Sequence, residues 1–407
     1  MSEQKIIIHY NEIRRTVRKP YNYLDLKNIF LEEFKEDNNN KYSFSYINFE
    51  DEKIDFNKLK NADKKTSLPI INATKIPFSN PNNLQKFKTL VGDANFNNTF
   101  IIFKSVLDII TLVYASKNNS IISYNMETYQ KINEYKNAHE GNIIIFLKHY
   151  FDIINIKDLM ISIGKDSKDL KIWNLNKHEI IYYYQNIIKY GSINAACILS
   201  DNNNICFIPG NFSKNYNEIE SLKVYNLNGS IRKEIGDSEP DIYLIDSYYD
   251  IYFSQYYIIT CNLGYVKSYD YKKNKVYHKY CSYDNWRHTN FIINNENKNV
   301  KLMESSYDGN IRIWNFHNGE LLNQIYISDK PISFICLWNN EYCFVSCTED
   351  FFFEKIDLNK GEVVKNIYKK ENDYRQNLTP VIKIYHPIYG ECLVFENNKN
   401  QIELWKN

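Results

Sequence analysis

Glycine is scarce in this sequence, with 12 residues among 407, whereas an average chain contains about 7% glycine. Tight turns therefore need another residue that tolerates the left-handed backbone region, and asparagine does so better than most residues with a side chain. Asparagine is abundant here and forms the tracts 38–40 and 202–204. We interpret these tracts as loops and expect asparagine at turn positions along the chain.

The sequence also lacks an excess of charge of either sign. It has 50 Lys and Arg against 49 Asp and Glu, which is a net charge of +1. This balance argues against a surface dedicated to nucleic acid, which is therefore not an expected direct ligand, and against a polybasic membrane anchor. With 43% hydrophobic and 24% charged residues, the composition is that of a folded globular protein.

No hydrophobic run is long enough to cross a membrane. The longest run, 101–114, is interrupted by Lys104 and Asp108 and falls short of the roughly 18–20 residues that a span needs. The N-terminus shows no apolar segment of the kind found in signal peptides. We expect a soluble protein of the cytoplasm, with the nucleus as the alternative compartment, and no membrane partner.

Cysteines and catalytic motifs are absent in the patterns that would indicate chemistry. The eight cysteines form no CxxC pair and none stands at zinc-finger spacing from a histidine pair, so we interpret them as small buried side chains in a reducing compartment. No phosphate-binding loop, dinucleotide-binding turn, nucleophile elbow or HExxH helix occurs. The sequence predicts no catalytic residue, no cofactor and no metal site, and a protein that is not an enzyme.

What the sequence does contain is a repeat. The segment LKIWNL at 170–175 recurs as IRIWNF at 311–316, and weaker copies fill the intervals. Each copy is a short alternating strand that ends at an anchor residue, and the seven anchors are Tyr124, Trp173, Tyr225, Tyr269, Trp314, Ile356 and Trp405. Their separations of 42 to 52 residues are near the period of about 40–45 residues that is typical of a propeller blade.

The best copy, SSYDGNIRIWN at 305–315, has an Asp-Gly turn six residues before its Trp and His288 upstream. Over 84–407 the chain resembles the WD-repeat β-propeller family. The resemblance implies an all-β propeller of seven four-stranded blades. It also implies hydrogen-bonded structural tetrads formed by His139, Ser162, Asp166 and Trp173 and by His288, Ser306, Asp308 and Trp314.

The same fold follows from the pattern of short strands separated by Asn-, Asp- and Ser-rich turns. A single four-stranded sheet cannot bury both of its faces, and stacking such sheets in a ring does so while leaving only short edges. The copy at 401–406 is the third strand of its blade, and no fourth strand follows it. The sequence therefore predicts that 84–90 supplies this strand and closes the ring.

The N-terminal 60 residues fit no blade. They predict strands at 5–10, 13–18 and 42–47, with a helix at 21–35 between the second and third strands. This order resembles a small α+β domain of the ubiquitin-like β-grasp type, and the acidic segment after Tyr46 makes it most similar to the Phox-and-Bem interaction domain. Residues 61–83, which include three prolines, are interpreted as a linker.

In the Phox-and-Bem family, an acidic cluster of one domain docks on a first-strand lysine of another by charge complementarity. The resemblance implies partner-binding roles for Lys5, Arg14 and Arg15 and for Glu50, Asp51, Glu52 and Asp55. Two alternatives stay open: the acidic residues form a solvated turn, or the domain is another β-grasp variant with an unrelated surface.

We therefore expect a non-enzymatic scaffold or adaptor that binds other proteins through the propeller rim and the N-terminal domain, as a member of a larger assembly. Candidate contacts on the propeller are the insertion 211–221 and the aromatic runs 182–184 and 351–353. The alternative is a substrate-recognition or assembly subunit, of a ubiquitin ligase or a ribosome-assembly particle. Trp173 and Trp314 are each followed by Asn and lack the motif common in the ligase form.

Overall fold

The structure is a computed structural model. It describes residues 5–10, 13–18, 41–47, 70–76, 84–91, 93–94, 99–106, 109–152, 155–201, 204–212, 221–235, 241–262, 264–280, 288–296, 299–347, 352–369, 380–386, 389–396 and 401–406. The chain divides into two compact units, Met1–Asn80 and Pro81–Asn407. No helix in these ranges is long and apolar enough to span a membrane.

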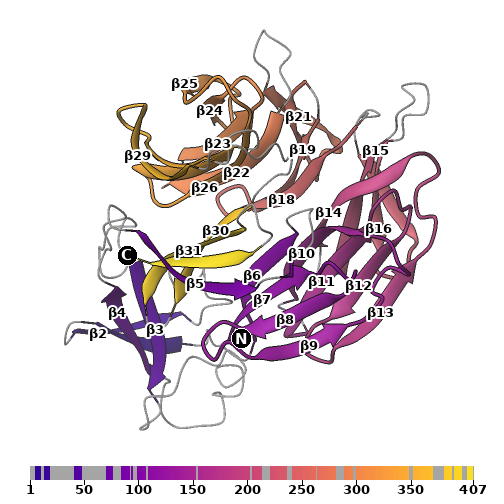
Figure 1. Ribbon diagram of the computed structural model, residues 1–407, viewed down its shortest axis with the longest axis horizontal. Coiled ribbons are helices and arrows are strands. Elements are labelled where there is room, and N and C mark those ends of the chain that lie inside the picture. Colours follow the sequence, from indigo (N-terminus) through magenta and orange to yellow (C-terminus); the bar gives the residue numbers. More distant parts are fainter. Residues whose placement is uncertain are drawn as a thin grey trace. The chain divides into compact units, whose positions relative to one another are not determined.

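The second unit is a ring of seven four-stranded antiparallel sheets, here called blades 1 to 7 (Figure 1). Blade 1 contains β6 (Phe100–Lys104), β7 (Ile110–Ala115), β8 (Ile121–Asn125) and β9 (Lys131–Tyr135). Blade 2 contains β10 (Ile144–Asp152), β11 (Lys157–Gly164), β12 (Leu170–Asn174) and β13 (Glu179–Tyr184). Blade 3 contains β14 (Ser192–Asp201), β15 (Asn204–Phe212), β16 (Leu222–Asn226) and β17 (Ile231–Ile235).

Blade 4 contains β18 (Leu244–Asp250), β19 (Gln255–Cys261), β20 (Val266–Asp270) and β21 (Lys275–Tyr280). Blade 5 contains β22 (His288–Glu296), β23 (Asn299–Ser306), β24 (Asn310–Asn315) and β25 (Leu321–Tyr326). Blade 6 contains β26 (Ile332–Leu337), β27 (Tyr342–Cys347), β28 (Phe352–Asp357) and β29 (Glu362–Lys369). Blade 7 contains β30 (Val381–His386), β31 (Gly390–Glu396), β32 (Ile402–Lys406) and β5 (Gln85–Val91). The predicted all-β, seven-bladed propeller is confirmed.

All seven anchor residues of the sequence repeat lie in the third strands of their blades, namely β8, β12, β16, β20, β24, β28 and β32. The first strands contact one another at most junctions between successive blades, so they line the centre of the ring and the fourth strands lie outermost. The third strand is therefore covered on both faces by neighbouring blades and on both edges by its own sheet. This burial explains why the repeat is most visible there.

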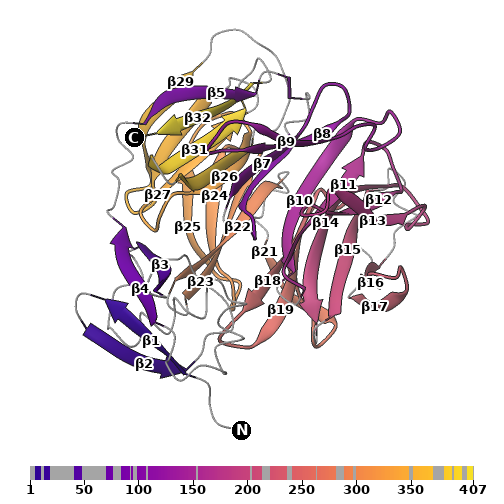
Figure 2. The same cartoon turned by 90° about the horizontal axis from the view of Figure 1, so that it is seen from below.

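The ring closes between distant parts of the sequence. In blade 7 the outer strand is β5, which pairs antiparallel with β32 in a register that places Lys88 opposite Leu404 (Figure 2). Lys86 of β5 also forms an ion pair with the buried carboxylate of Glu403 in β32. The segment that the sequence assigned to ring closure, 84–90, thus coincides with β5 to within one residue.

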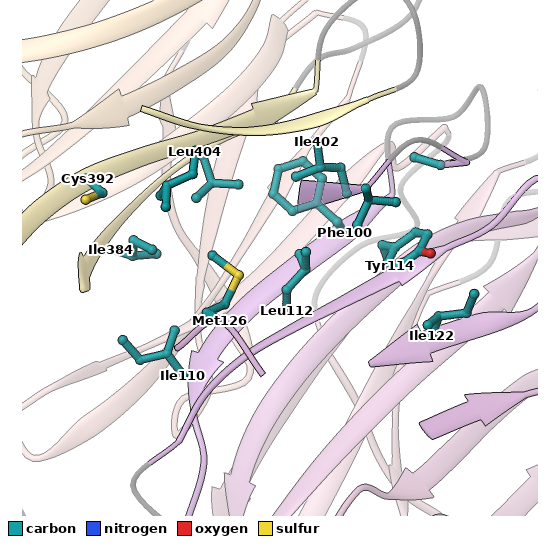
Figure 3. Packing of buried hydrophobic residues seen from close by; sticks show 13 residues of the cluster. Phe100, Ile110, Leu112, Tyr114, Ile122, Met126, Ile384, Cys392, Ile402 and Leu404 are labelled. Atoms are coloured by element: carbon teal, nitrogen blue, oxygen red, sulfur yellow. The ribbon is translucent and has the colours of Figure 1, made fainter. Parts of the chain in front are cut away.

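The core is divided among the spaces between blades. In β7, Leu112 and Tyr114 face blade 7 and pack with Val394 and other apolar residues there (Figure 3). The alternate residues of β7 face blade 2, where Val113 packs near Trp173. Because side chains alternate between the two faces of a strand, a strand buried on both faces must be largely apolar, as β7 is apart from Thr111.

Turns between third and fourth strands are capped by the residue that follows the anchor. Asn174 Oδ1 accepts hydrogen bonds from the N–H groups of Asn176 (3.1 Å) and Lys177 (3.2 Å), and corresponding bonds are made by Asn125, Asp270, Asn315 and Asp357. The turns then need a left-handed residue, which is Gly319 in blade 5 but Asn274 in blade 4. Left-handed asparagines also occur at 119, 137 and 186, so the expected use of asparagine in turns is confirmed.

The first unit contains a four-stranded mixed sheet of β1 (Lys5–Tyr10), β2 (Ile13–Arg18), β3 (Lys41–Ile47) and β4 (Ile70–Ile76), in the order β2-β1-β4-β3. Strand β1 pairs antiparallel with β2 and parallel with β4. The prediction of a linker over 61–83 is therefore wrong at Ile70–Ile76. The prolines at 69 and 77 that flank this stretch favour a linker, but the β-branched residues between them favour a strand. The predicted helix at 21–35 lies outside the described residues.

Candidate functional site

The tetrad residues predicted in blade 2 come together in part. Trp173 Nε1 donates to Ser162 Oγ at 2.7 Å, and Ser162 Oγ lies 2.7 Å from His139 Nε2. Because the indole can only donate, the serine satisfies both neighbours by accepting from Trp173 and donating to a neutral His139. The chain of bonds ties the segment between blades 1 and 2 to strands β11 and β12.

Asp166, the fourth predicted member, lies elsewhere. It is exposed in the β11–β12 turn with a left-handed backbone (φ 52°). The buried Lys171 donates from Nζ to the carbonyl of Ala138, the residue before His139, at 2.8 Å. Burial lowers the pKa of His139 to about 4, and the charge of Lys171 acts in the same direction. The ring is therefore neutral at neutral pH.

Blade 5 shows a different version of this arrangement. The indole of Trp314 donates to the buried carboxylate of Glu304 at 3.4 Å, rather than to Ser306. Arg312 lies between the acidic groups, 3.7 Å from Glu304 and in contact with Asp308, and its Nη1 donates to Ser306 Oγ at 2.9 Å. Burial alone would raise the pKa of Asp308, but hydrogen bonds from Arg312 and Ser306 hold it below the usual value.

His288 begins β22, and its side chain lies outside the described part of the structure. Glu304 lies opposite Arg312 in the sheet, as Ser162 lies opposite Lys171. It was not predicted, because the tetrad position was assigned to Ser306, two residues further along the chain. Both clusters are buried and join strands, so their role is structural.

Of the partner-binding residues predicted in the N-terminal unit, three lie in described strands. Lys5 pairs opposite Arg18, His9 opposite Arg14, and Ile8 opposite Arg15. Neighbours in register share a face of a sheet, so Lys5 and Arg14 occupy positions on one face and Arg15 a position on the other. The acidic residues Glu50, Asp51, Glu52 and Asp55 lie outside the described residues.

Most of the propeller residues that were predicted to contact partners either form hydrogen bonds within the propeller or lie outside the described residues. Tyr183 OH donates to Asp169 at 3.1 Å, and Tyr184 OH donates to the carbonyl of Leu227, so these rings serve the blade itself. The inner part of the insertion, 213–220, and the side chains of 351–353 lie outside the described residues.

An exposed group of aromatic residues that the sequence analysis did not single out lies in the β18–β19 hairpin of blade 4. Tyr249, Tyr252 and Phe253 are all exposed, and 60% of Phe253 is accessible to solvent. We call residues 249–254 the aromatic turn. The hairpin closes with Asp250 opposite Gln255, which leaves a four-residue loop whose last residue, Ser254, is left-handed (φ 49°). Loops of this length are most often built around a type I turn.

A buried carboxylate holds the aromatic turn in place. Asp250 is fully buried, and its Oδ1 accepts hydrogen bonds from the N–H groups of Tyr252 (2.8 Å) and Phe253 (3.2 Å). Its Oδ2 lies 3.1 Å from Nε2 of His317 in blade 5. First-to-second and third-to-fourth strand turns lie at the same end of an antiparallel blade, so this contact joins two adjacent turns of neighbouring blades at one end of the propeller.

His317 in turn supports the exposed ring. The rings of Phe253 and His317 meet edge to face with centroids 5.0 Å apart, and His278 Nε2 lies 2.5 Å from the carbonyl of His317. Burial lowers the pKa of His317 below its usual value, the charge of Asp250 opposes this shift, and His278 reinforces it. His317 is therefore neutral at neutral pH, and its ring packs against the ring of Phe253.

The aromatic turn presents a large apolar ring, that of Phe253, whose backbone is bonded to Asp250 and whose ring packs on His317. Exposed aromatic residues whose position is already fixed lose little conformational entropy on binding, which is why they dominate interface hot spots. A sequence signal did exist, the run YYDIYF at 248–253, but only the fold shows which rings are exposed. Among the described residues, no group of three His, Cys, Asp or Glu side chains is placed to hold a metal ion.

Comparison with known proteins adds no further constraint. No family model matches this chain, and no curated protein is significantly similar to it.

Proposed function

We propose that this protein is a non-enzymatic scaffold that binds other proteins, with the aromatic turn as its docking point on the propeller. The single observation that carries the proposal is Phe253, a large apolar side chain that is 60% exposed although its turn is held by Asp250 and its ring by His317. A β-propeller is commonly a protein-interaction scaffold, and exposed, well-ordered aromatic side chains are the residues such surfaces use.

The chemistry of this surface defines the partner segment. Tyr249 packs on Tyr256 with ring centroids 4.8 Å apart, and Tyr252 and Phe253 are exposed in the same turn. The carboxylate of Asp250 is fully buried, with Oδ1 bonded to N–H groups of the turn and Oδ2 lying 3.1 Å from His317 Nε2, so it offers no ionic contact to a partner. The partner is therefore an apolar segment of another protein that packs against these rings.

We further propose that the propeller is of the WD-repeat type and that the N-terminal unit is a Phox-and-Bem-like β-grasp domain with a second protein-binding surface. The sheet order β2-β1-β4-β3 with a parallel central pair supports the β-grasp assignment, because it is the order of that fold. Two binding units in one chain would raise the effective concentration of one partner near another. We therefore propose that the protein is a member of a larger assembly.

Six cysteines within the described residues are buried thiols. Free buried thiols are typical of proteins in reducing compartments, which supports the proposed location in the cytoplasm or nucleus.

The test uses the full chain as a target for a library of random displayed peptides. We expect enrichment of apolar peptides whose affinity falls at least tenfold for Phe253→Asp, since a carboxylate would be placed in the apolar contact. The control is Phe151→Asp, which changes an exposed aromatic residue at the same end of blade 2. Peptides that bind both variants as well as the unaltered protein, or no enrichment at all, would overturn the proposal.

A further inference from the structure

The turn between the third and fourth strands of blade 4 carries an excess of positive charge. Lys272, Lys273 and Lys275 lie within four residues of one another and are all exposed. Lys273 pairs with the buried Asp270, whose Oδ2 lies 3.4 Å from its Nζ. Neither Lys272 nor Lys275 forms an ion pair with an acidic residue in the part of the chain that the structure describes. We call residues 271–275 the lysine turn.

The corresponding turns of blades 2 and 6 balance their charge internally. In blade 2, Lys177 Nζ lies 4.0 Å from Glu179 Oε1. In blade 6, Lys360 Nζ lies 3.7 Å from Glu362 Oε1. Both glutamates stand six residues after the anchor of their blade, and in blade 4 that position is occupied by Lys275. The lysine turn therefore has like charges where these two blades have an ion pair, and an acidic group from outside would relieve their repulsion.

The lysine turn is held beside the aromatic turn. The N–H of Tyr271 donates to the carbonyl of Tyr256 at 3.1 Å, and Tyr256 is the residue on which Tyr249 of the aromatic turn packs. Lys233 of blade 3 donates to the carbonyl of Tyr271, and its Nζ lies 3.3 Å from the centroid of that ring. Because the fourth strands lie outermost in the ring, the lysine turn stands on the outer side of the aromatic turn.

We propose that the protein segment that docks on the aromatic turn carries an acidic side chain, which pairs with Lys272 and Lys275. This proposal rests on the proposed function and adds to it the charge of the partner. A carboxylate at this place supplies the negative charge that a glutamate of the chain itself supplies in blades 2 and 6. The apolar residues of the same segment pack on Tyr252 and Phe253. The partner is therefore a segment with apolar residues toward the centre of the ring and an acidic residue toward its outer edge.

A polyanion fits this surface less well than a short acidic segment does. Binding to anionic membranes commonly uses about four to eight clustered basic residues, and nucleic-acid binding commonly uses about six to ten phosphate contacts. The lysine turn offers Lys272 and Lys275. In the adjacent turn of blade 5, the exposed Glu320 stands at the position that corresponds to Lys275. A continuous negative surface would meet this carboxylate, whereas a segment with one acidic position avoids it.

The test uses the full chain and displayed random peptides, with those peptides as probes whose binding is lost in Phe253→Asp. We expect these peptides to be enriched in Asp or Glu relative to the starting library. At low salt, Lys275→Glu should weaken their binding about fivefold, because it replaces an ion pair by two like charges. The control is Lys177→Glu, which makes the same charge change in the corresponding turn of blade 2 and should leave binding unchanged. Thermal melts check that both variants fold.

An exchange of charges locates the contact. A probe peptide whose acidic residue is changed to lysine should bind Lys275→Glu more tightly than it binds the unaltered protein. If no peptide depends on Phe253, the proposed function fails, and the acidic partner residue fails with it. If Phe253-dependent peptides lack Asp and Glu, or bind Lys275→Glu and Lys177→Glu equally well, only the role of the lysine turn is overturned. Binding of phosphatidylserine vesicles or of single-stranded RNA that Lys275→Glu abolishes, without enrichment of acidic peptides, would also overturn it and would assign the lysine turn to a polyanion.

Discussion

Glu396, at the end of β31, offers a quantitative test of how the ring closes. It continues the alternate positions of Cys392 and Val394, which face blade 1 in the core shown in Figure 3. Only 1% of the residue is exposed, and neither carboxyl oxygen has a hydrogen-bond partner among the described residues. Burial raises the pKa of this carboxyl to about 8, with the charge of Lys117 as the opposing influence. The side chain is therefore protonated at neutral pH.

The sign of the pH dependence follows from the raised pKa. Below the unfolded-state pKa of 4.5 the group is neutral in both states and makes no pH-dependent contribution to stability. As the pH rises from there to about 8, the unfolded chain ionises while the folded chain does not, so stability is progressively lost. A shift of 3.5 pKa units at 1.36 kcal/mol each corresponds to a loss of about 5 kcal/mol between pH 4.5 and pH 8.

The perturbation is Glu396→Gln, which keeps the size and removes the titration. Its own buried amide adds a cost, about 1–3 kcal/mol, that does not depend on pH. The free energy of unfolding of both proteins is measured with urea between pH 5 and pH 8. As the pH rises over this range, the difference between them should shift in favour of Glu396→Gln by about 4 kcal/mol.

Glu341→Gln is the matched control, because Glu341 is exposed and the same substitution there should leave the pH profile unchanged. The reasoning would be refuted if the difference between Glu396→Gln and the unaltered protein stayed constant with pH. A constant difference would mean that Glu396 is ionised in the folded protein and has a partner that stabilises its charge.

Two further changes test the packing between blades. Burial lowers the pKa of His139 from 6.5 to about 4. The stability contributed by the neutral ring is therefore present above pH 6.5 and is lost as the pH falls to 4, a loss of about 3 kcal/mol. In urea unfolding, His139→Gln should lose less stability at acid pH than the unaltered protein, and an equal loss would contradict this account. Gly309 is left-handed (φ 73°), and an added Cβ would lie 1.7 Å from the Ser328 carbonyl oxygen, so Gly309→Ala should cost more than about 2 kcal/mol in chemical unfolding. The control Gly141→Ala, also left-handed but with open space around it, should cost only about 1 kcal/mol, and equal losses at both sites would show that the clash is relieved.

Much of the propeller was predictable because its stabilising unit is local and repeated. Each third strand is buried on both faces, so Trp173 and Trp314 recur in the same setting, and the following Asn is needed to cap the next turn. The linker prediction failed at Ile70–Ile76 for the opposite reason. That strand is stabilised by pairing with β1 and β3, which come from distant parts of the sequence.

The candidate sites depend on tertiary structure to different degrees. Ser162, His139 and Trp173 were implied by the family resemblance, but Glu304 was not, because its role arises from Arg312 and Trp314 meeting it inside one blade. The aromatic turn required more, since Asp250 and His317 are contributed by different blades. The spacing of residues along the sequence predicts contacts within one repeat, but it does not predict contacts between residues of different repeats.

The sequence by itself determined the repeat, the number of blades and the residues that anchor them, because periodic burial leaves a periodic pattern of residue types. Only the tertiary structure decided which aromatic rings stay exposed, which carboxyl groups lose their solvent and which sheet edges remain open. Those properties depend on what each side chain meets across the boundary between blades, and residues that meet there are separated along the chain by distances that no local pattern encodes.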